Sequence, residues 1–320
     1  MQLNIKKRKI DYKKEKNLQA FRHINLEVAA GFPYFYGKND MGCFIIVLLV
    51  CVGAALIANS RIIRWQRRAA NAYFIIAQKA ATAEEREWGY RNAYMCGHPK
   101  AKFFYIYAAA DAFSGRKPLT PFVIHLEDGV DVTAIFYDYY IRERHISYGS
   151  ERQQEVTQRV LELKDGENPS SDLYSEALRT LEGYLGENWR CGTGPVIIFM
   201  PCSGEQAHFQ RFDSLSRSLK WRYKYNTDIE AVQYTGVRRS KHRSRNRSAI
   251  ESNSNIVISP KIIGKEVVII DDVITTGSSL REFASELRTY GVRVKAAVFL
   301  AQTAKFPSDK EIHRHIKSAD

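Results

Sequence analysis

The sequence predicts an α/β protein with a parallel sheet in its final third, preceded by a transmembrane helix and a helical region. Two observations support this prediction: apolar segments alternate with amphipathic ones over 195–302, and one long run near the N-terminus is uncharged. Of the 320 residues, 45% are hydrophobic and 26% charged, which excludes a globally disordered chain. The five cysteines form no CxxC pair, so neither a disulfide framework nor a structural zinc site is expected.

The charge of the chain is strongly basic, with 48 Lys and Arg against 35 Asp and Glu, or +13 at pH 7. Such an excess favours polyanionic partners: nucleic acid, anionic lipid headgroups or a phosphorylated substrate. The basic residues gather at 1–16, 61–68 and 238–247. Each cluster could be a solvated surface, but the second and third stand beside features that indicate function.

Residues 41–60 carry no charged side chain, and 42–58 read GCFIIVLLVCVGAALIA. A helix of about 20 such residues crosses the hydrocarbon core of a bilayer. The alternative is a buried core helix, although such a helix rarely stays apolar on every face for so long. Four arginines follow within 61–68, and the positive-inside rule then places the C-terminal part in the cytoplasm. We expect an uncleaved single-pass anchor at 41–60 after a basic N-terminal segment at 1–40.

The region 61–120 is expected to be helical. Ala93, Gly97, Ala101 and Tyr105 follow one another at four-residue spacing, which resembles one Sel1-like helix–turn–helix repeat. Because a single repeat cannot bury its own apolar face, we expect a helical hairpin that leans on the next domain.

The last predicted domain is 121–320, with its core at 195–302. Before the core, the pattern predicts strand structure over 123–141 and helices over 151–163 and 171–189. The elements predicted in the core are a strand at 195–200, a turn at 201–204, a helix at 205–220, a strand at 228–233, a basic loop at 235–254, a strand at 266–270, a helix at 280–290 and a strand at 292–300. This order implies a parallel sheet whose ligand lies at the carboxyl ends of its strands. His313 and His315 are expected in a polar tail.

The stretch 267–279, VVIIDDVITTGSS, carries the chemistry. Its apolar strand delivers Asp271 and Asp272 to the carboxyl edge of the sheet, and the loop 275–279 then opens a helix. A helix N-terminus offers free N–H groups and a positive dipole end, which suit a phosphate. Gly277 allows close approach of the backbone. The hydroxyl donors of this loop are Thr275, Thr276, Ser278 and Ser279. Two carboxylates would repel a phosphate, so they are better suited to sugar hydroxyls or Mg²⁺.

This stretch resembles the phosphoribosyl-pyrophosphate (PRPP) signature of the type I phosphoribosyltransferases. With Arg211, Phe212 and Asp213 in the helix upstream, it looks nearest to the competence-associated ComF-like homologues. The resemblance implies the parallel-sheet type I phosphoribosyltransferase fold and an enzyme that uses PRPP and Mg²⁺. Asp271 and Asp272 would be the catalytic acids, on the ribose 2′ and 3′ hydroxyls and on the metal, directly or indirectly.

The resemblance implies three further groups of residues. The 5′-phosphate loop would be Thr275, Thr276, Gly277, Ser278 and Ser279, and the pyrophosphate loop Cys202, Ser203 and Gly204. A mobile lid would fall at 235–254, with the cationic candidates Arg239, Lys241, His242 and Arg243. Thr275 stands where the 6-oxopurine enzymes usually carry Asp, which argues against a hypoxanthine–guanine type enzyme.

The sequence therefore predicts a membrane-anchored transferase that moves a phosphoribosyl group to a nitrogen nucleophile such as a nucleobase and releases pyrophosphate. The alternatives are a non-catalytic regulatory protein that binds PRPP or a nucleotide, and a DNA-uptake-related protein whose basic loop binds nucleic acid. A homo-oligomer is left open.

Overall fold

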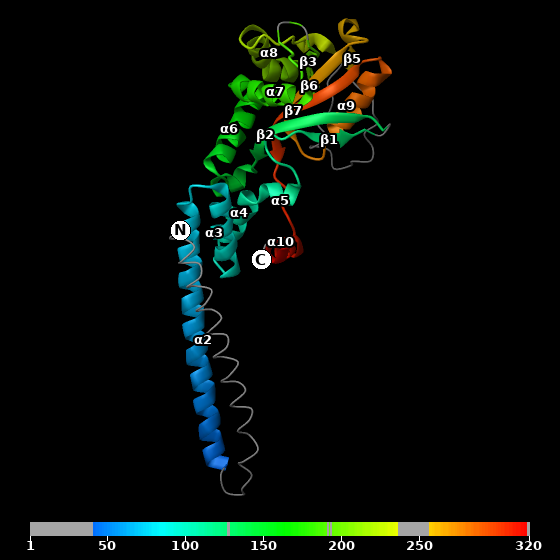
Figure 1. Ribbon diagram of the computed structural model, residues 1–320. Helices are drawn as coiled ribbons and strands as arrows, with labels where there is room; N and C mark the ends of the chain where they lie inside the picture. The colour runs from blue at the N-terminus through cyan, green and yellow to red at the C-terminus, as the bar shows by residue number, and fades with distance from the viewer. Residues whose placement is uncertain (1–40, 127–128, 191, 193, 236–255, 319–320) are drawn as a thin grey trace. The chain divides into compact units, whose positions relative to one another are not determined.

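The computed structural model describes residues 41–126, 129–190, 192, 194–235 and 256–318 (Figure 1). The chain divides into two compact units, 1–68 and 69–320. The described part of the first unit belongs to helix α2 (Met41–Gln78), which continues into the second unit without a break. The predicted boundaries at 40, 60 and 120 stay predictions.

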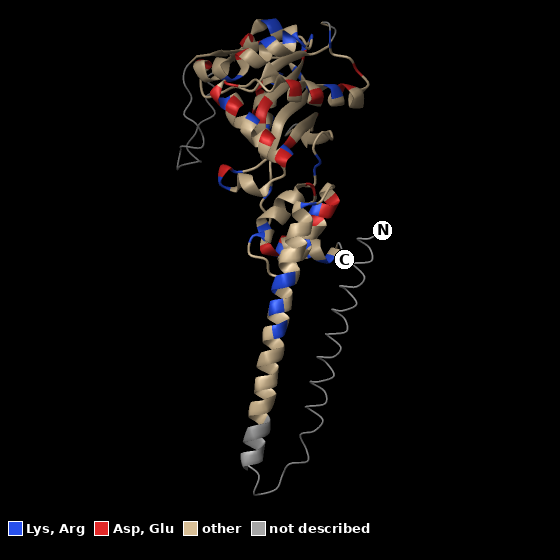
Figure 2. Cartoon of the chain, turned by 90° about the vertical axis from the view of Figure 1, so that its left-hand side faces the viewer, with Lys and Arg blue, Asp and Glu red and all other residues tan. Residues whose placement is uncertain are grey.

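Helix α2 contains a stretch, Leu48–Gln78, that is long and apolar enough to cross a membrane by length and composition. Figure 2 shows a part of this helix without charged side chains, followed by basic ones. The helix extends past the predicted end at 60 because 61–78 contain neither Gly nor Pro and are rich in good helix formers. The basic residues at 61–68 are exposed on it.

The helical region that was predicted is present in the second unit. After α2 come helices α3 (Ala83–Met95), α4 (Ala101–Ala108) and α5 (Ala110–Ser114). Thr82 caps α3 by accepting a hydrogen bond from the Glu85 N–H. Helices α2 and α3 touch where a Cβ on Gly89 would lie 2.7 Å from the Cβ of Ala77. The likeness to a Sel1-like repeat stays a prediction.

The C-terminal segment is not the polar tail that the sequence led us to expect. Residues 309–318 form helix α10 (Asp309–Ser318), because Ile312 and Ile316 stand four positions apart and form one apolar face. Both isoleucines are buried with Ala77, Tyr90 and Tyr105 of the helical region. His315 Nε2 lies 3.4 Å from a Glu87 carboxylate oxygen. The tail thus closes the core of the helical region.

The central sheet has five strands in the order β1-β2-β7-β6-β3. Its strands are β1 (Phe122–His125), β2 (Asp131–Tyr140), β3 (Val196–Phe199), β6 (Glu266–Ile274) and β7 (Arg293–Thr303). Only β1 pairs antiparallel among these neighbours, so the predicted mostly parallel α/β sheet is confirmed. Strands β4 (Val232–Tyr234) and β5 (Ile256–Ile258) form a separate antiparallel pair.

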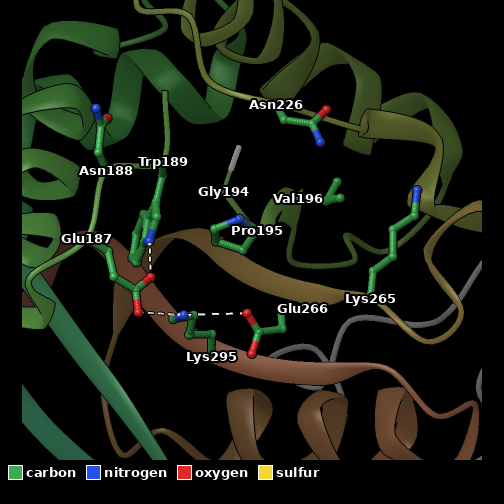
Figure 3. A pocket seen from close by; sticks show the side chains of 10 residues that line it. All are labelled: Glu187, Asn188, Trp189, Gly194, Pro195, Val196, Asn226, Lys265, Glu266 and Lys295. Atoms are coloured by element: carbon green, nitrogen blue, oxygen red, sulfur yellow. Dashed lines mark hydrogen bonds and ion pairs between the residues drawn. The ribbon is translucent and has the colours of Figure 1, made fainter. Parts of the chain in front are cut away.

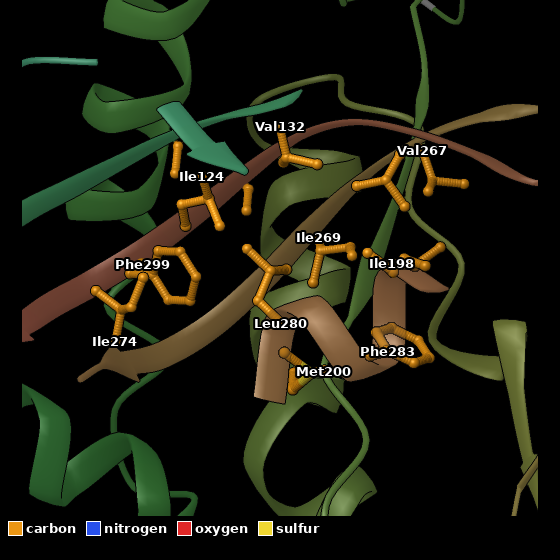
Figure 4. Packing of buried hydrophobic residues seen from close by; sticks show 14 of the residues in the cluster. Ile124, Val132, Ile198, Met200, Val267, Ile269, Ile274, Leu280, Phe283 and Phe299 are labelled. Atoms are coloured by element: carbon orange, nitrogen blue, oxygen red, sulfur yellow. The ribbon is translucent and has the colours of Figure 1, made fainter. Parts of the chain in front are cut away.

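Helices cover both faces of the sheet. One face packs against α6 (Glu151–Asp165), α7 (Ser171–Leu185) and α8 (Glu205–Trp221). The other packs against α9 (Ser278–Thr289) and the β4–β5 pair. In Figure 4, Leu280 and Phe283 of α9 lie against Ile198 and Ile269 of the sheet. Short 3₁₀ turns occupy Glu143–Tyr148, Ile229–Ala231 and Pro260–Ile262.

Helix α7 ends four residues before the predicted end at 189. Gly186 follows it with φ 68°, in the left-handed region that glycine adopts without cost. The layers leave the carboxyl ends of β3 and β6 side by side, since the two strands pair in parallel up to Phe199 and Ile270.

Candidate functional site

The predicted acids and the predicted pyrophosphate loop lie at the same edge of the sheet. Asp271 and Asp272 stand near the end of β6, and the segment 200–204 leaves the neighbouring strand β3. The Met200 N–H donates to the Ile270 carbonyl at 2.8 Å, which fixes this segment beside the acids. The structure therefore brings these residues together.

Asp272 is buried and surrounded by donors. Its side chain is 9% exposed, and its Oδ2 lies 3.1 Å from Arg211 Nη1 on α8 and 3.6 Å from Lys164 Nζ on α6. Its Oδ1 accepts a hydrogen bond from the Val273 N–H at 2.6 Å. The carboxylate therefore has its charge compensated within the protein.

Asp271 has different surroundings. It is partly buried, and its Oδ1 accepts one hydrogen bond, from the Asp272 N–H at 2.8 Å. Burial, and after it the nearby Asp272 carboxylate, raises the pKa of Asp271 well above its ordinary 3.8. Tyr174 on α7 donates its hydroxyl to the Asp271 carbonyl at 2.8 Å and so anchors the backbone here.

The predicted phosphate loop lies between β6 and α9. Its four hydroxyl residues are exposed, whereas Gly277 is buried and has φ 78° as the N-cap of α9. Thr275 Oγ1 lies 3.0 Å from Thr303 Oγ1 on β7, which ties the loop to the sheet. The first turn of α9 has no acidic residue, so its positive end carries no counter-charge of its own.

Two arginines near this loop were not singled out from the sequence. Arg281 Nη2 donates to the Thr276 carbonyl at 3.3 Å. The Arg116 guanidinium lies 4.1 Å from the centre of the Phe122 ring and donates to Gln302 Oε1 at 3.3 Å. Burial lowers the pKa of Arg116, and the positive charge of Arg281 lowers it further. Within the described residues, neither guanidinium has a salt bridge to a carboxylate.

One backbone donor of the predicted pyrophosphate loop is already hydrogen-bonded within the protein. The Cys202 N–H donates to the Tyr234 hydroxyl at 2.9 Å. Burial raises the pKa of the Cys202 thiol to about 12, so the thiol stays protonated at neutral pH. Ser203 is exposed, and Gly204 is the N-cap of α8. The loop therefore offers the Ser203 hydroxyl to a ligand more readily than the Cys202 N–H.

The lid candidates Arg239, Lys241, His242 and Arg243 lie outside the described residues. The strands that flank them are described: β4 and β5 pair antiparallel, with Tyr234 opposite Ile256. Tyr234 of β4 is the residue that contacts Cys202, so the end of this strand adjoins the predicted pyrophosphate loop.

Three residues around the acids lacked a decisive signal in the sequence. For Arg211 the sequence indicates only a family resemblance and no contact with the acids. Lys164 and Tyr174 lie on helices before the predicted core. Their side chains reach the acids through packing between distant segments, which no local pattern encodes.

A cavity of about 510 Å³ lies at the opposite, amino-terminal edge of the sheet (Figure 3). Three of its four charged side chains pair with one another, since Lys295 Nζ lies 2.7 Å from Glu187 and 3.4 Å from Glu266, and the fourth, Lys265, is exposed. The Trp189 indole N–H also donates to Glu187, at 2.7 Å. Because both acidic side chains here are held by Lys295, we read this cavity as structural.

The described residues contain no cluster of three or more His, Cys, Asp or Glu side chains that could hold a metal. Mg²⁺ in phosphate-binding sites is commonly held by one or two carboxylates together with ligand phosphates. Asp271, which forms no salt bridge within the described residues, fits that role, and Asp272 fits it less well.

Comparison with known proteins finds a family model that is similar to part of the chain. Residues 209–318 match the family model of the phosphoribosyl transferase domain. The matched region contains Asp271, Asp272 and the loop 275–279, which confirms the predicted family resemblance and fold. Nearness to the ComF-like homologues stays a prediction.

Among solved structures, an orotate phosphoribosyltransferase from Francisella tularensis is similar at 14% identity, over 62% of this chain and 75% of that chain, with a TM-score of 0.25. No curated protein matches the chain.

Proposed function

We propose that this protein is a membrane-anchored phosphoribosyltransferase that uses PRPP and Mg²⁺ to transfer a phosphoribosyl group to a nitrogen nucleophile, a nucleobase by preference. One observation carries the proposal. An acidic pair and a hydroxyl-rich loop at a helix N-terminus share one sheet edge, within a region that matches the phosphoribosyl transferase domain.

Each part of this edge suits one part of PRPP. The exposed hydroxyls and N–H groups of 275–279 would bind the 5′-phosphate at the positive end of α9. Arg281 and Arg116 would add positive charge at the same place. Asp271 would accept hydrogen bonds from the ribose hydroxyls.

The transfer itself breaks the bond between ribose C1 and the pyrophosphate oxygen and forms a bond from C1 to the nucleophile's nitrogen, and the proton of that nitrogen is released to water. Positive charge develops on the ribose as pyrophosphate leaves, so catalysis would be largely electrostatic. Bound Mg²⁺ would supply charge neutralisation on the pyrophosphate oxygens. Asp271 would both orient the ribose and favour its developing positive charge, and the basic segment 238–247 would screen the leaving group.

The membrane part of the proposal rests on α2. Its stretch Leu48–Gln78 is long and apolar enough to span, and its apolar side chains are exposed, as Leu49 at 65% shows. The arginines at 61–68 favour a cytoplasmic C-terminal unit. A cytoplasmic site would have access to PRPP and to free nucleobases.

The first test is calorimetric titration of PRPP with Mg²⁺ into the full chain in detergent. Asp271→Asn should weaken binding by about 10- to 150-fold, as expected for a lost hydrogen bond to a charged group. The matched control is Asp131→Asn, since Asp131 is an exposed acid at the amino end of β2, on the opposite edge. A folded wild-type chain that does not bind PRPP would refute the transferase proposal.

The second test measures pyrophosphate release with a panel of nucleobases. Release establishes transfer and identifies the acceptor. Binding without release from any base supports instead a non-catalytic PRPP- or nucleotide-binding protein. One contact favours that second candidate: the Cys202 N–H is already engaged by Tyr234. Salt-sensitive DNA binding, lost when the arginines of 238–247 are replaced, would support a nucleic-acid role.

A further inference from the structure

The two carboxylates of the acidic pair are not equivalent in this chain. Asp272 is 6% exposed, whereas Asp271 is partly exposed beside the Cys202 loop. We propose that, of the two acids, only Asp271 contacts the bound sugar phosphate, and that Asp272 is a positioning residue held by Arg211 and Lys164. This inference rests on the proposed function and divides a role that the family resemblance assigns to both acids.

Both oxygens of Asp272 already have partners. Oδ2 faces Arg211 Nη1 at 3.1 Å and Lys164 Nζ at 3.6 Å, while Oδ1 accepts from the Val273 N–H at 2.6 Å. A buried carboxylate held by a guanidinium and an ammonium is costly to separate from them, because each partner would be left with an uncompensated charge. A ribose hydroxyl is a neutral donor and is a weaker partner than either cation.

Asp271 has the opposite character. Within the described residues no Lys, Arg or His side chain forms a salt bridge with it, and its one hydrogen-bond donor is the Asp272 backbone N–H. That N–H belongs to the residue that Arg211 and Lys164 immobilise. The Tyr174 hydroxyl holds the Asp271 carbonyl from the other side. Fixing Asp272 therefore fixes the orientation of the Asp271 side chain.

The two cations meet at Asp272 because α6 ends against α8. Gly166 caps α6, and a Cβ there would lie 2.6 Å from the Gln210 carbonyl oxygen. The Gln210 side chain also donates to the Asp165 carbonyl at 3.0 Å. Lys164 directly precedes Asp165 and Arg211 directly follows Gln210, so this contact brings the two cationic residues close to each other. Lys164 lies before the matched region 209–318, so one of the two cations that compensate the Asp272 carboxylate comes from outside that region.

The test is a double-mutant cycle on PRPP affinity, measured with Mg²⁺ by calorimetry on the full chain in detergent. The variants are Asp271→Asn, Asp272→Asn and the two together. We expect Asp271→Asn to weaken binding by about 10- to 150-fold and Asp272→Asn by about tenfold or less. In the double variant, the Asp272 replacement should add no more than about threefold, because its effect acts through Asp271.

The double variant decides between a positioning role and direct contact. Full additivity, with the double variant weakened by the product of the single effects, would overturn the inference, since it would place Asp272 on the ligand. Arg211 gives a second readout: Arg211→Gln should weaken PRPP binding like Asp272→Asn, and Arg211→Lys should restore most of it. An Arg211→Lys variant as weak as Arg211→Gln would also contradict the charge-based account.

Two further controls keep the result clear. If Asp272→Asn does not fold, Lys164→Met takes its place in the cycle, because the Lys164 side chain is 38% exposed and its loss leaves the Arg211–Asp272 contact intact. A folded wild-type chain that fails to bind PRPP refutes the proposed function and this inference with it. Wild-type binding with an additive cycle refutes the inference alone.

Discussion

The replacement Gly166→Ala should destabilise the unit 69–320 far more than a comparable change at another helix end. Gly166 has φ 77°, where a residue with a Cβ costs about 1–2 kcal/mol. A Cβ there would also lie 2.6 Å from the Gln210 backbone oxygen and 3.0 Å from its Cγ. Because a backbone atom cannot swing away, this overlap should add about 1–3 kcal/mol. The expected loss of unfolding free energy is about 2–5 kcal/mol.

Gly186→Ala provides the matched control. Gly186 ends α7 with φ 68°, but a Cβ there meets nothing within 4 Å. It therefore has the backbone cost without the steric one. For a unit of this size, about 1 kcal/mol shifts Tm by about 2–4 °C, so Gly166→Ala should melt about 2–12 °C below Gly186→Ala. Fluorescence of the buried Trp189 can follow both transitions.

Gly166→Ala should also disturb the candidate functional site. Moving α6 away from α8 would lengthen the 3.6 Å contact between Lys164 and Asp272. Equal melting temperatures for the two alanine variants would show that α6 and α8 can move apart at no cost in stability. This result would refute the argument that their close packing brings Lys164 and Arg211 together.

Three other predictions concern separate parts of the chain. Tyr174→Phe should cost about 1–3 kcal/mol in denaturant unfolding, because it leaves the Asp271 carbonyl without its 2.8 Å donor. Leu49→Lys places a charge in the apolar part of α2 and should oppose membrane insertion by about 2.5–3.5 kcal/mol, measured by resistance to alkaline extraction. The Lys305 ammonium and the Ser308 N–H and hydroxyl lower the pKa of Glu311 from 4.5 to about 2. The stability that Glu311 gives to α10 should therefore be present above pH 4.5 and lost as the pH falls toward 2, and Glu311→Gln should remove this pH dependence of amide exchange in α10.

Each of these has an internal control. Tyr184→Phe, at a side chain that is 64% exposed, should leave stability unchanged. Ile75→Lys lies in the same helix but beyond the predicted anchor 41–60 and the arginines of 61–68, and should leave membrane insertion intact. Amide exchange in α9 should not follow the titration of Glu311, since the side-chain bonds of Glu311 to described residues stay within the segment 305–311. Changes in the controls as large as in the variants would contradict the three explanations.

The sheet could be predicted because each strand is a short, continuous apolar run that ends at polar or turn residues. The run 267–270 became part of the first half of β6, and 292–300 became most of β7. The turn before α9 followed from residue types alone, since Gly277 adopts the left-handed conformation that its place there requires, while the phosphate-binding role of this loop stays a prediction. These features are local, so the sequence contains them.

The helix α10 was missed for the opposite reason. Its two isoleucines stand among charged and polar residues, and their apolar face has meaning only against Ala77 and Tyr105, more than 200 positions earlier in the chain. The same holds for Arg116, which reaches Gln302 near the phosphate loop from outside the predicted domain 121–320. Long-range packing supplies both contacts.

The acidic pair shows how far a motif can be interpreted. Successive residues of a strand point to opposite faces, so two adjacent acids cannot have the same surroundings, whatever the motif suggests. Each acid therefore faces the layer that covers its own face of the sheet. Asp272 faces α6 and α8, which supply Lys164 and Arg211. The motif predicts that carboxylates stand at the strand end. Which of them is left for a ligand depends on Lys164 and Arg211, and the double-mutant cycle measures that choice directly.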